Sequence, residues 1–367
     1  MQDSAVREAI RGHAGPIDAG GFVPTVVSQP GISVVVPVKD RVALMRAQLA
    51  SLREAMDRSP EPAEVIVVDD SAPAVAAEHR ANCLEFGARY VAGPAHVGAK
   101  RNLGVEEARY DLVLFTDSDC RVSPDLLERH VKTMRDAGES VGGVAGPTFV
   151  EDGEARANRI MRWSNLINDD LERPARSAAV TWATTTNVVV RRSVFIEVGG
   201  FPSESLDIVG GEDCDLGLKI SDGGYRIVCD PGAVVVHDHA ITDSIGTAAR
   251  RLYGYGRSEQ WVCSVHPHHR RPVVNAFTVG AVAIVAGAAL APFTGGLSLL
   301  AAPVSVGLLV GLRSRRLRGA DRSARAIAER FACASVELMF DLGGFTAALA
   351  MRRPSMLFTG LKPADAS

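Results

Sequence analysis

The sequence lacks paired cysteines and a strong excess of charge of either sign. Its six cysteines are scattered and form no C-x-x-C pair, which argues against a disulfide framework or a zinc site. Buried free thiols in a reducing compartment are the simpler expectation. The formal net charge is only −3, so the chain has no basic coat for a nucleic-acid partner.

The first 30 residues lack an apolar core of signal-peptide length. Glycines and prolines stand there among mixed polar residues, which predicts a loosely ordered lead-in over residues 1–30. We therefore expect the folded domain that follows to stay in the cytoplasm. The chain also has no internal repeat and no low-complexity tract.

What the first half does contain is an alternation of strand and helix patterns. Short β-branched or apolar runs predict strands, and apolar residues at helical spacing predict helices between them. The predicted strands are 32–36, 65–68, 89–91 and 112–115, and the predicted helices are 42–56, 74–86 and 99–108. This order predicts an α/β fold with a mostly parallel sheet, whose ligand site lies at the carboxyl ends of the strands.

The second half is less regular up to residue 240. Strands are expected over 184–190, 225–229 and 233–236, and a helix over 214–221 follows Gly210 and Gly211.

Beyond residue 266 the composition changes. Residues 273–312 carry no charge, are interrupted by Pro292 and two glycines, and have arginines on both flanks. A membrane hairpin with both ends in the cytoplasm satisfies the positive-inside rule. A re-entrant pair and a small soluble helical bundle are the alternatives. The apolar segment 331–351 contains Glu337 and Asp341, which favours an amphipathic helix lying in the membrane interface over a third span.

Acidic residues follow two of the predicted strands. Asp117 and Asp119 close the strand 112–115, and residues i and i+2 of a strand face the same way. Two carboxylates beside a diphosphate suit Mg²⁺ or Mn²⁺, although aspartates are common at strand ends without any metal. Asp70 ends an earlier strand and is placed to accept hydrogen bonds from a base or ribose, or to serve only as a turn residue.

Three further positions stand out. Lys100 and Arg101 begin a helix, where cations oppose the helix dipole, so a phosphate partner or simple surface exposure has to account for them. Glu212 and Asp213 begin another helix and suit either a capping role or a general base. His237 follows an apolar strand and is a candidate third metal ligand.

Taken together, these motifs resemble family-2 glycosyltransferases. The resemblance extends from Ile32 to His239 and is carried by motifs in a fixed order: Val34-Val-Val-Pro-Val-Lys-Asp-Arg41, Val65-Ile-Val-Val-Asp-Asp-Ser71, Gly98-Ala-Lys-Arg-Asn-Leu-Gly104, Leu114-Phe-Thr-Asp-Ser-Asp119, Ala183-Thr-Thr-Thr-Asn187, Val198-Gly-Gly-Phe201 and Gly211-Glu-Asp-Cys-Asp-Leu216. It implies a GT-A-type catalytic domain over residues 31–266, followed by a membrane-associated helical region over 267–367.

The resemblance also implies an inverting transfer from a nucleotide-diphosphate sugar and a role for each motif residue. Pro37 and Asp70 would hold the base, while Lys100, Arg101 and Asp117 would contact the nucleotide. Asp119 and His237 would hold the Mg²⁺ or Mn²⁺ ion. Asp213 would be the general base, and Glu212 would support it.

One departure concerns processivity. Processive members carry a Q-x-x-R-W motif, but Arg257-Ser-Glu-Gln-Trp261 has the wrong spacing, which favours transfer of one sugar per reaction. Trp182 and Trp261 are candidates for stacking on an acceptor sugar or for core packing. The hairpin favours a lipid-linked or otherwise membrane-borne acceptor and a place at the cell membrane. A nucleotidyltransferase that makes sugar nucleotides and a non-enzymatic sugar-binding adaptor are the alternative functions.

Overall fold

The computed structural model describes residues 29–203 and 210–365. The predicted lead-in over residues 1–30 falls almost entirely outside this range. The central element is an eight-stranded sheet in the order β3-β2-β1-β4-β9-β6-β10-β8. Its strands are β1 (Gln29–Val38), β2 (Ala63–Asp69), β3 (Arg89–Ala92), β4 (Tyr110–Phe115), β6 (Val141–Ala145), β8 (Ala179–Val180), β9 (Val188–Arg191) and β10 (Arg226–Cys229).

Most neighbouring strands of this sheet run parallel. Strands β3, β2, β1 and β4 are parallel to one another, and β10 is parallel to β6. Strand β9 runs antiparallel between β4 and β6, and β8 is antiparallel to β10. The predicted mostly parallel α/β sheet with flanking helices is therefore confirmed, and the three strands predicted around the first acidic motifs lie side by side.

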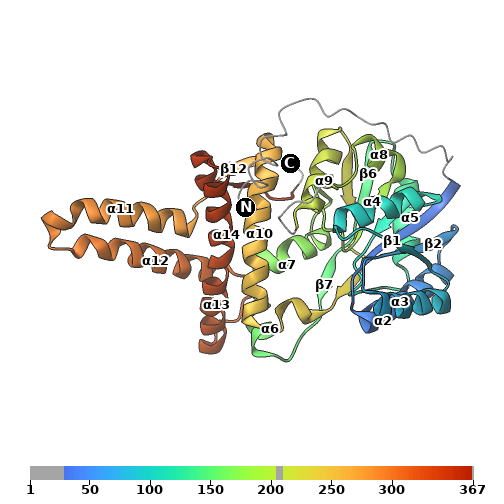
Figure 1. Cartoon of the computed structure of the whole chain (residues 1–367), viewed down its shortest axis with the longest axis horizontal. Helices are drawn as coiled ribbons and strands as arrows, with labels where there is room; N and C mark the ends of the chain where they lie inside the picture. The colour runs from blue at the N-terminus through green and yellow to red at the C-terminus, as the bar shows by residue number, and fades with distance from the viewer. Residues whose placement is uncertain (1–28, 204–209, 366–367) are drawn as a thin grey trace.

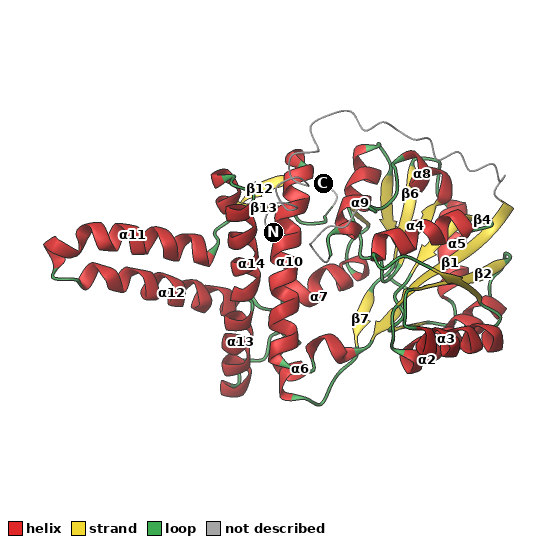
Figure 2. Cartoon of the chain, in the orientation of Figure 1, coloured by secondary structure: helices red, strands yellow, loops and turns green. Residues whose placement is uncertain are grey.

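Helices cover both faces of the sheet because successive β-branched side chains of the central strands point to opposite sides. Val34 and Val36 of β1 pack with α2 (Val42–Asp57), α3 (Pro73–Phe86) and α5 (Leu126–Asp136). Val35 packs in a second cluster with α4 (Val97–Glu107), α8 (Arg192–Glu197) and α9 (Glu212–Asp222). Figure 2 shows these helices around the yellow sheet.

The strand expected over residues 184–190 begins later than predicted. Asn187 N donates to Thr184 O, so residues 184–187 form a turn before β9. The amide of Asn187 donates to the carbonyl oxygens of Pro147 and Ala233. These local polar contacts replace the sheet ladder that the β-branched composition favoured.

A small second sheet lies beside the large one. It has the order β5-β11-β7, with β5 (Cys120–Val122), β11 (Val235–His237) and β7 (Thr148–Val150). His237 pairs with Cys120 on one side and with Val150 on the other. This register brings the end of β11 next to the residue that precedes β5, which is Asp119.

The C-terminal region is helical, and one pair of helices projects from the molecule. Helices α11 (Ala276–Thr294) and α12 (Ala301–Arg316) extend together away from the rest, whereas α13 (Ala324–Val336) and α14 (Leu338–Ala350) run across their base (Figure 1). The described residues contain three segments long and apolar enough to cross a membrane, at Ala276–Thr294, Leu297–Arg316 and Ala324–Ala350. The hairpin carries exposed apolar side chains such as Val285 and Phe293, which are 71% and 85% exposed.

The single helix predicted over 331–351 is instead part of two helices that meet at Glu337. This residue is buried and accepts a hydrogen bond from Ser164 Oγ at 2.7 Å. Asp341 accepts hydrogen bonds from Arg313 Nη2 and from the backbone N–H of Ala276. The two acids that favoured an interfacial helix therefore bind groups inside the protein.

The chain returns to the sheet after α14. Strand β13 (Thr359–Leu361) pairs with β12 (Arg270–Pro272), and Thr181 N donates to Ala364 O at 2.7 Å. Met356 and Leu361 share a hydrophobic cluster with Trp182 and Leu218. The packing thus crosses the predicted boundary at residues 266 and 267, and within residues 29–203 and 210–365 the hairpin is the part that projects from it.

The helix before that boundary joins the two regions. Helix α10 (Ile245–Val265) lies between the sheet and α14 (Figure 1). A Cβ atom at Gly256 would lie 1.9 Å from Phe340 O, and one at Gly343 would lie 2.1 Å from Tyr253 O. Only glycine allows the backbones of α10 and α14 to approach this closely.

Candidate active site

The predicted acidic residues meet at the carboxyl edge of the large sheet. Asp70 follows β2 and Asp117 follows β4, on either side of β1. Asp70 forms ion pairs with Lys100 Nζ and, at 3.5 Å, with Lys39 Nζ. The preceding Asp69 instead accepts hydrogen bonds from Ser71 and Tyr90, so it holds the local loop in place.

The two cations at the start of α4 have carboxylate partners. Lys100 and Arg101 are both buried, and Lys100 Nζ also donates to Val38 O at 2.8 Å. Arg101 donates through Nη2 to Asp117 Oδ1 and through Nη1 to Glu212 Oε1, each at 2.8 Å. Burial opposes the charge, but the two carboxylates raise the pKa of Arg101 above its ordinary value, so the guanidinium stays charged.

Arg101 therefore connects two distant parts of the chain. Its partner Asp117 ends β4, whereas Glu212, which is 111 positions away from Arg101, begins α9. The apparent conflict between these cations and the helix dipole is resolved by carboxylates, which stabilise positive charge more strongly than the dipole opposes it.

Asp119 and His237 form the second half of the site. His237 Nε2 lies 3.4 Å from Asp119 Oδ1, and both side chains are buried. The backbone fixes this approach, because Asp238 N donates to Asp119 O at 2.9 Å. His237 Nδ1 lies 2.7 Å from Asp238 O, a carbonyl oxygen that can only accept, so Nδ1 donates this hydrogen bond and Nε2 is the ring nitrogen that faces Asp119.

Ligand atoms of Asp119, Cys120 and His237 lie within 4.8 Å of one another, which is a suitable geometry for one cation. A carboxylate oxygen and an imidazole nitrogen fit a divalent ion such as Mn²⁺ or Mg²⁺ when a bound ligand and water supply further oxygens. Burial raises the pKa of the Cys120 thiol well above its ordinary value, so this group stays protonated and is a poor ligand. Asp119 and His237 therefore fit the predicted metal, and Cys120 does not.

Sequence reasoning assigned no role to Arg41, although it ends the first motif. Its guanidinium forms an ion pair with Asp119 Oδ2. Asp40 and Arg41 both adopt left-handed backbone angles, with φ values of 57° and 58°, which non-glycine residues rarely do. The signal available in the sequence was the run of charged residues directly after a buried strand that ends at this same edge.

Glu212 and Asp213 lie in the first turn of α9, behind a tight glycine turn. Gly211 is the N-cap residue, with φ of 89°, and a Cβ atom there would lie 3.1 Å from Val262 Cγ2 of α10. Asp213 Oδ1 accepts a hydrogen bond from Cys214 N at 2.8 Å. Because the cap is a glycine, Asp213 is not the capping residue.

The environment of Asp213 favours its neutral form. Burial, followed by the negative charge of Glu212, raises the pKa of Asp213 from 3.8 to about 7. The hydrogen bond from Cys214 N and the charge of Arg101 oppose this shift. The carboxyl group is thus able to gain and lose a proton near neutral pH.

The remaining predicted site residues differ in their surroundings. Pro37 is buried in β1 and pairs in register with Val68 of β2, one residue before Asp69. Trp182 is only 8% exposed and packs against α9, where a Cβ atom at Gly217 would lie 2.3 Å from Trp182 Cβ. Its ring therefore has a core-packing role. Trp261 is half-buried and lies beside Gly211, which keeps it close to Asp213.

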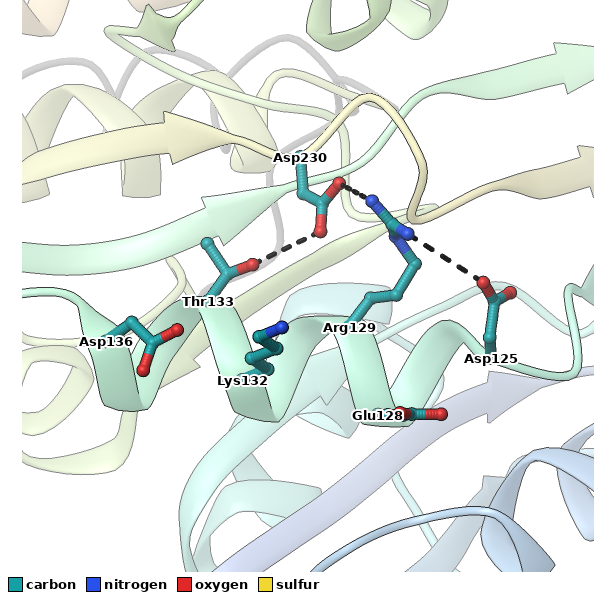
Figure 3. Close-up of a pocket in the computed structure, with 7 residues that line it drawn as sticks. All are labelled: Asp125, Glu128, Arg129, Lys132, Thr133, Asp136 and Asp230. Atoms are coloured by element: carbon teal, nitrogen blue, oxygen red, sulfur yellow. Dashed lines mark hydrogen bonds and ion pairs between the residues drawn. The ribbon is translucent and has the colours of Figure 1, made fainter.

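A cavity of about 280 Å³ on α5 contains none of the predicted residues (Figure 3). Arg129 pairs with Asp230 at 2.6 Å, and Thr133 Oγ1 donates to the same carboxylate at 3.2 Å. The central charged groups of this cavity satisfy one another, so the sheet edge remains the candidate site.

Known proteins resemble this chain in sequence and in fold. Residues 33–199 match the model of glycosyl transferase family 2. The chain is 30% identical over 257 residues to the pre-mycofactocin glycosyltransferase of Mycobacterium tuberculosis, a match that covers 68% of this chain and 51% of that protein. It is 25% identical over 246 residues to an N-acetylglucosaminyltransferase of Rhizobium leguminosarum bv. viciae, with 62% and 55% covered. The chain thus spans about half the length of the curated relatives it matches.

A solved structure extends the likeness over nearly the whole chain. The mannosyltransferase PcManGT from Pyrobaculum calidifontis, in complex with GDP-Man and Mn²⁺, superposes with a TM-score of 0.51. The superposition covers 96% of this chain and 94% of that one at 18% sequence identity. At this level of identity the likeness establishes the fold.

Proposed function

Because the chain belongs to glycosyl transferase family 2 and has the GT-A-type fold, we propose that it moves one sugar from a nucleotide-diphosphate sugar to an acceptor hydroxyl. The observation that carries this proposal is the bridge made by Arg101 between Asp117 and Glu212. It brings the strand end that precedes Asp119 next to the helix start that carries Asp213. A donor-binding group and a proton acceptor therefore lie close together at one edge of the sheet.

The donor would bind across the strand ends. Pro37 and Asp70 would contact the base and ribose, while Lys100, Arg101 and Asp117 would contact the nucleotide. Asp119 and His237 would hold a Mg²⁺ or Mn²⁺ ion, which supplies positive charge that stabilises the departing nucleoside diphosphate. In PcManGT the ligands named with the structure are GDP-Man and Mn²⁺, which supports a divalent ion beside the diphosphate here as well.

Asp213 would act as the general base. It accepts the proton of the acceptor hydroxyl while that oxygen bonds to the anomeric carbon. The bond from this carbon to the donor phosphate breaks on the opposite face, so the anomeric configuration inverts. Glu212 supports this step because its charge helps to raise the pKa of Asp213 toward neutral pH.

Product analysis with a panel of sugar nucleotides and Mn²⁺ tests this function. We expect slow release of nucleoside diphosphate in water and faster release when the acceptor is present. A nucleotidyltransferase would consume pyrophosphate and form a nucleoside triphosphate, and a sugar-binding adaptor would bind without turnover. The residues after β1, Val38-Lys-Asp-Arg41, lack the glycine-rich loop typical of nucleotidyltransferases, which favours the transferase.

We further infer that the α11–α12 hairpin anchors the chain in a membrane, with the GT-A domain on the cytoplasmic side. Arginines flank both ends of the hairpin, at Arg270 and Arg271 before α11 and at Arg313, Arg315 and Arg316 at the end of α12. Helices α13 and α14 cross its base, which suits a position in the interface. A lipid-linked or other membrane-borne acceptor would then lie on the same side of the membrane as the candidate active site.

Excising the hairpin separates membrane anchoring from folding. Residues 279–311 can be replaced by a short Gly-Ser linker, because Ala276 and Arg313 both contact Asp341 and so lie close together. We expect the excised protein to leave the membrane fraction and still bind nucleoside diphosphate with Mn²⁺, since the core cluster around Trp182 and Met356 is untouched.

Centrifugation and carbonate extraction of the full chain and the excised variant measure this effect. A full chain that stays soluble without detergent would mean that the hairpin packs against protein. An excised variant that remains in the membrane would move the anchor to α13 and α14. Truncation at residue 266 is a poor substitute, because it removes Met356 and Leu361 from the core.

A further inference from the structure

Arg251 on α10 is a half-buried cation whose charge has no carboxylate partner within 4.0 Å among residues 29–203 and 210–365. Its Nε atom is buried and donates no hydrogen bond. Its nearest described partner is the ring of Tyr255, whose centroid lies 5.9 Å from the guanidinium carbon. A buried donor left without an acceptor destabilises the folded state, so the protein keeps Arg251 at a cost to its stability.

The position of Arg251 relates it, through Tyr255, to the Gly210–Gly211 turn. Tyr255 lies one helical turn further on, about 6 Å along the axis, and its Cδ1 atom would lie 3.9 Å from a Cβ atom at Gly210. Gly210 precedes the turn that presents Glu212 and Asp213. Burial raises the pKa of Tyr255; Arg251 lowers it, and the charges of Asp213, Asp117 and Glu212 raise it further. The phenol therefore lies within the electrostatic field of both the catalytic acids and Arg251.

The helix that carries Arg251 and Tyr255 lies beside the turn that presents Glu212 and Asp213. Helix α10 begins shortly after His237, and its face with Tyr255 and Val262 packs against the Gly210–Gly211 turn. Figure 1 shows α10 standing between the sheet and α14, at the base of the hairpin. Arg251 thus lies on the helix that separates the sheet from the membrane-associated helices.

Arg251 also differs from the other cations of the site. Arg41 pairs with Asp119, Lys100 with Asp70, and Arg101 with Asp117 and Glu212. Those three charges are neutralised by these carboxylates. An arginine with no acid beside it and an unused Nε donor is suited to receive the oxygens of a phosphate, which a guanidinium binds through two parallel hydrogen bonds.

We propose that Arg251, together with Tyr255, forms a phosphate-binding subsite on α10 that holds a phosphate group of the substrate opposite the strand ends. This inference rests on the proposed transferase function. The phosphate belongs either to a membrane-borne acceptor, whose hydroxyl is then presented to Asp213, or to the donor diphosphate. Either ligand would present phosphate oxygens to Arg251, and separate binding measurements with the two ligands distinguish them.

The test uses the full chain in neutral phosphatidylcholine nanodiscs. In the first arm, the affinity for nucleoside diphosphate is measured in the presence of Mn²⁺. In the second arm, the affinity for a long-chain prenyl monophosphate is measured by comparing nanodiscs with and without this lipid. Thermophoresis is the readout in both arms. Arg251→Gln is expected to weaken one of these affinities by about ten- to a hundredfold, because it removes hydrogen bonds to a charged group. Tyr255→Phe keeps the ring and should weaken the same ligand less.

Arg250→Gln is the matched control, because Arg250 is the exposed neighbour on the same helix. The Arg250→Gln protein should bind both ligands with the affinity of the wild type. Loss confined to the prenyl phosphate assigns the subsite to the acceptor, and loss confined to the nucleoside diphosphate assigns it to the donor. If Arg251→Gln fails to fold, Arg251→Lys replaces it and should show a smaller loss in the same arm.

Unchanged affinity for both ligands in a folded Arg251→Gln protein would overturn the subsite. This result is distinct from failure of the proposed function, in which the wild-type protein itself would release no nucleoside diphosphate from any sugar nucleotide.

Discussion

Replacing Asp213 with asparagine is expected to lower kcat by roughly two to four orders of magnitude, which is the usual contribution of a general base. Asparagine is nearly isosteric, and its amide oxygen still accepts the hydrogen bond from Cys214 N. The asparagine side chain cannot take the proton from the hydroxyl group of the acceptor substrate. The affinity for nucleoside diphosphate should therefore stay close to that of the wild type, and the loss should lie in turnover.

The pH dependence follows from the same group. The base has to be ionised, and the pKa of Asp213 is about 7, so the wild-type kcat should rise with pH up to about 7 and level off above it. Well below that pH it should fall by about tenfold per unit. The residual activity of Asp213→Asn should lack this dependence.

As the pH rises, the stability of the folded wild type should fall while its kcat rises. The pKa of Asp213 is raised from 3.8 to about 7 on folding, so the folded state holds a proton that the unfolded state has lost in this range. Raising the pH from 4 to 7 therefore lowers the stability of the wild type. Asparagine avoids this loss, and the melting temperature of Asp213→Asn should exceed that of the wild type at pH 8 and converge with it near pH 4.

Glu212→Gln is the companion variant, because it removes the neighbouring charge and leaves the base in place. It should lower the pH at which kcat levels off. A folded Asp213→Asn protein that binds donor and turns over at near the wild-type rate would remove Asp213 from the mechanism and direct attention to Glu212 or Asp215.

Loss of the proposed metal ligand Asp119 is expected to have the second large effect. Asp119→Asn should lower kcat/KM by about a hundredfold or more, because stabilisation of the leaving diphosphate by a metal is worth several kcal/mol. Chelation with EDTA should abolish activity of the wild type, and added Mn²⁺ or Mg²⁺ should restore it. Calorimetry with Mn²⁺ alone should show weaker binding to Asp119→Asn than to the wild type.

The ion pair with Arg41 has to be separated from metal binding. Arg41 is about half exposed, with a side-chain exposure of 47%, so water can solvate it once Asp119 is changed. The double variant Arg41→Gln/Asp119→Asn should therefore match Asp119→Asn in Mn²⁺ affinity. Asp136→Asn, on α5 and away from the sheet edge, is the control that should behave as the wild type. Full activity in metal-free buffer would reject the assignment of Asp119 and His237.

The elements with strong local patterns were predictable to within a few residues. The helix predicted over 42–56 is α2 at Val42–Asp57, and the strand predicted over 65–68 is β2 at Ala63–Asp69. Both patterns reflect the same packing, because apolar residues at helical spacing and β-branched runs are buried on the faces of one sheet. The turn at residues 184–187 was missed because side-chain hydrogen bonds overruled strand propensity there.

The chain after α14 was the least predictable part. Nothing local in residues 354–365 indicates that they pair with β12 and pack beside Trp182. Such contacts are specified by shape and by hydrogen bonds between segments far apart in the sequence, whereas a local pattern reports only which side of an element is buried.

The sequence by itself determined the family and the alternation of strands and helices in the first half, and it predicted the site residues, because each of these is written in short motifs at the ends of elements. Only the tertiary structure decided which of these residues meet. Arg101 joins Asp117 to Glu212, the register of β11 against β5 sets His237 beside Asp119, and α10 brings Tyr255 against the Gly210–Gly211 turn. The raised pKa of Asp213 belongs to the same class of property, since it arises from burial and from a neighbouring charge that exist only once the chain is folded.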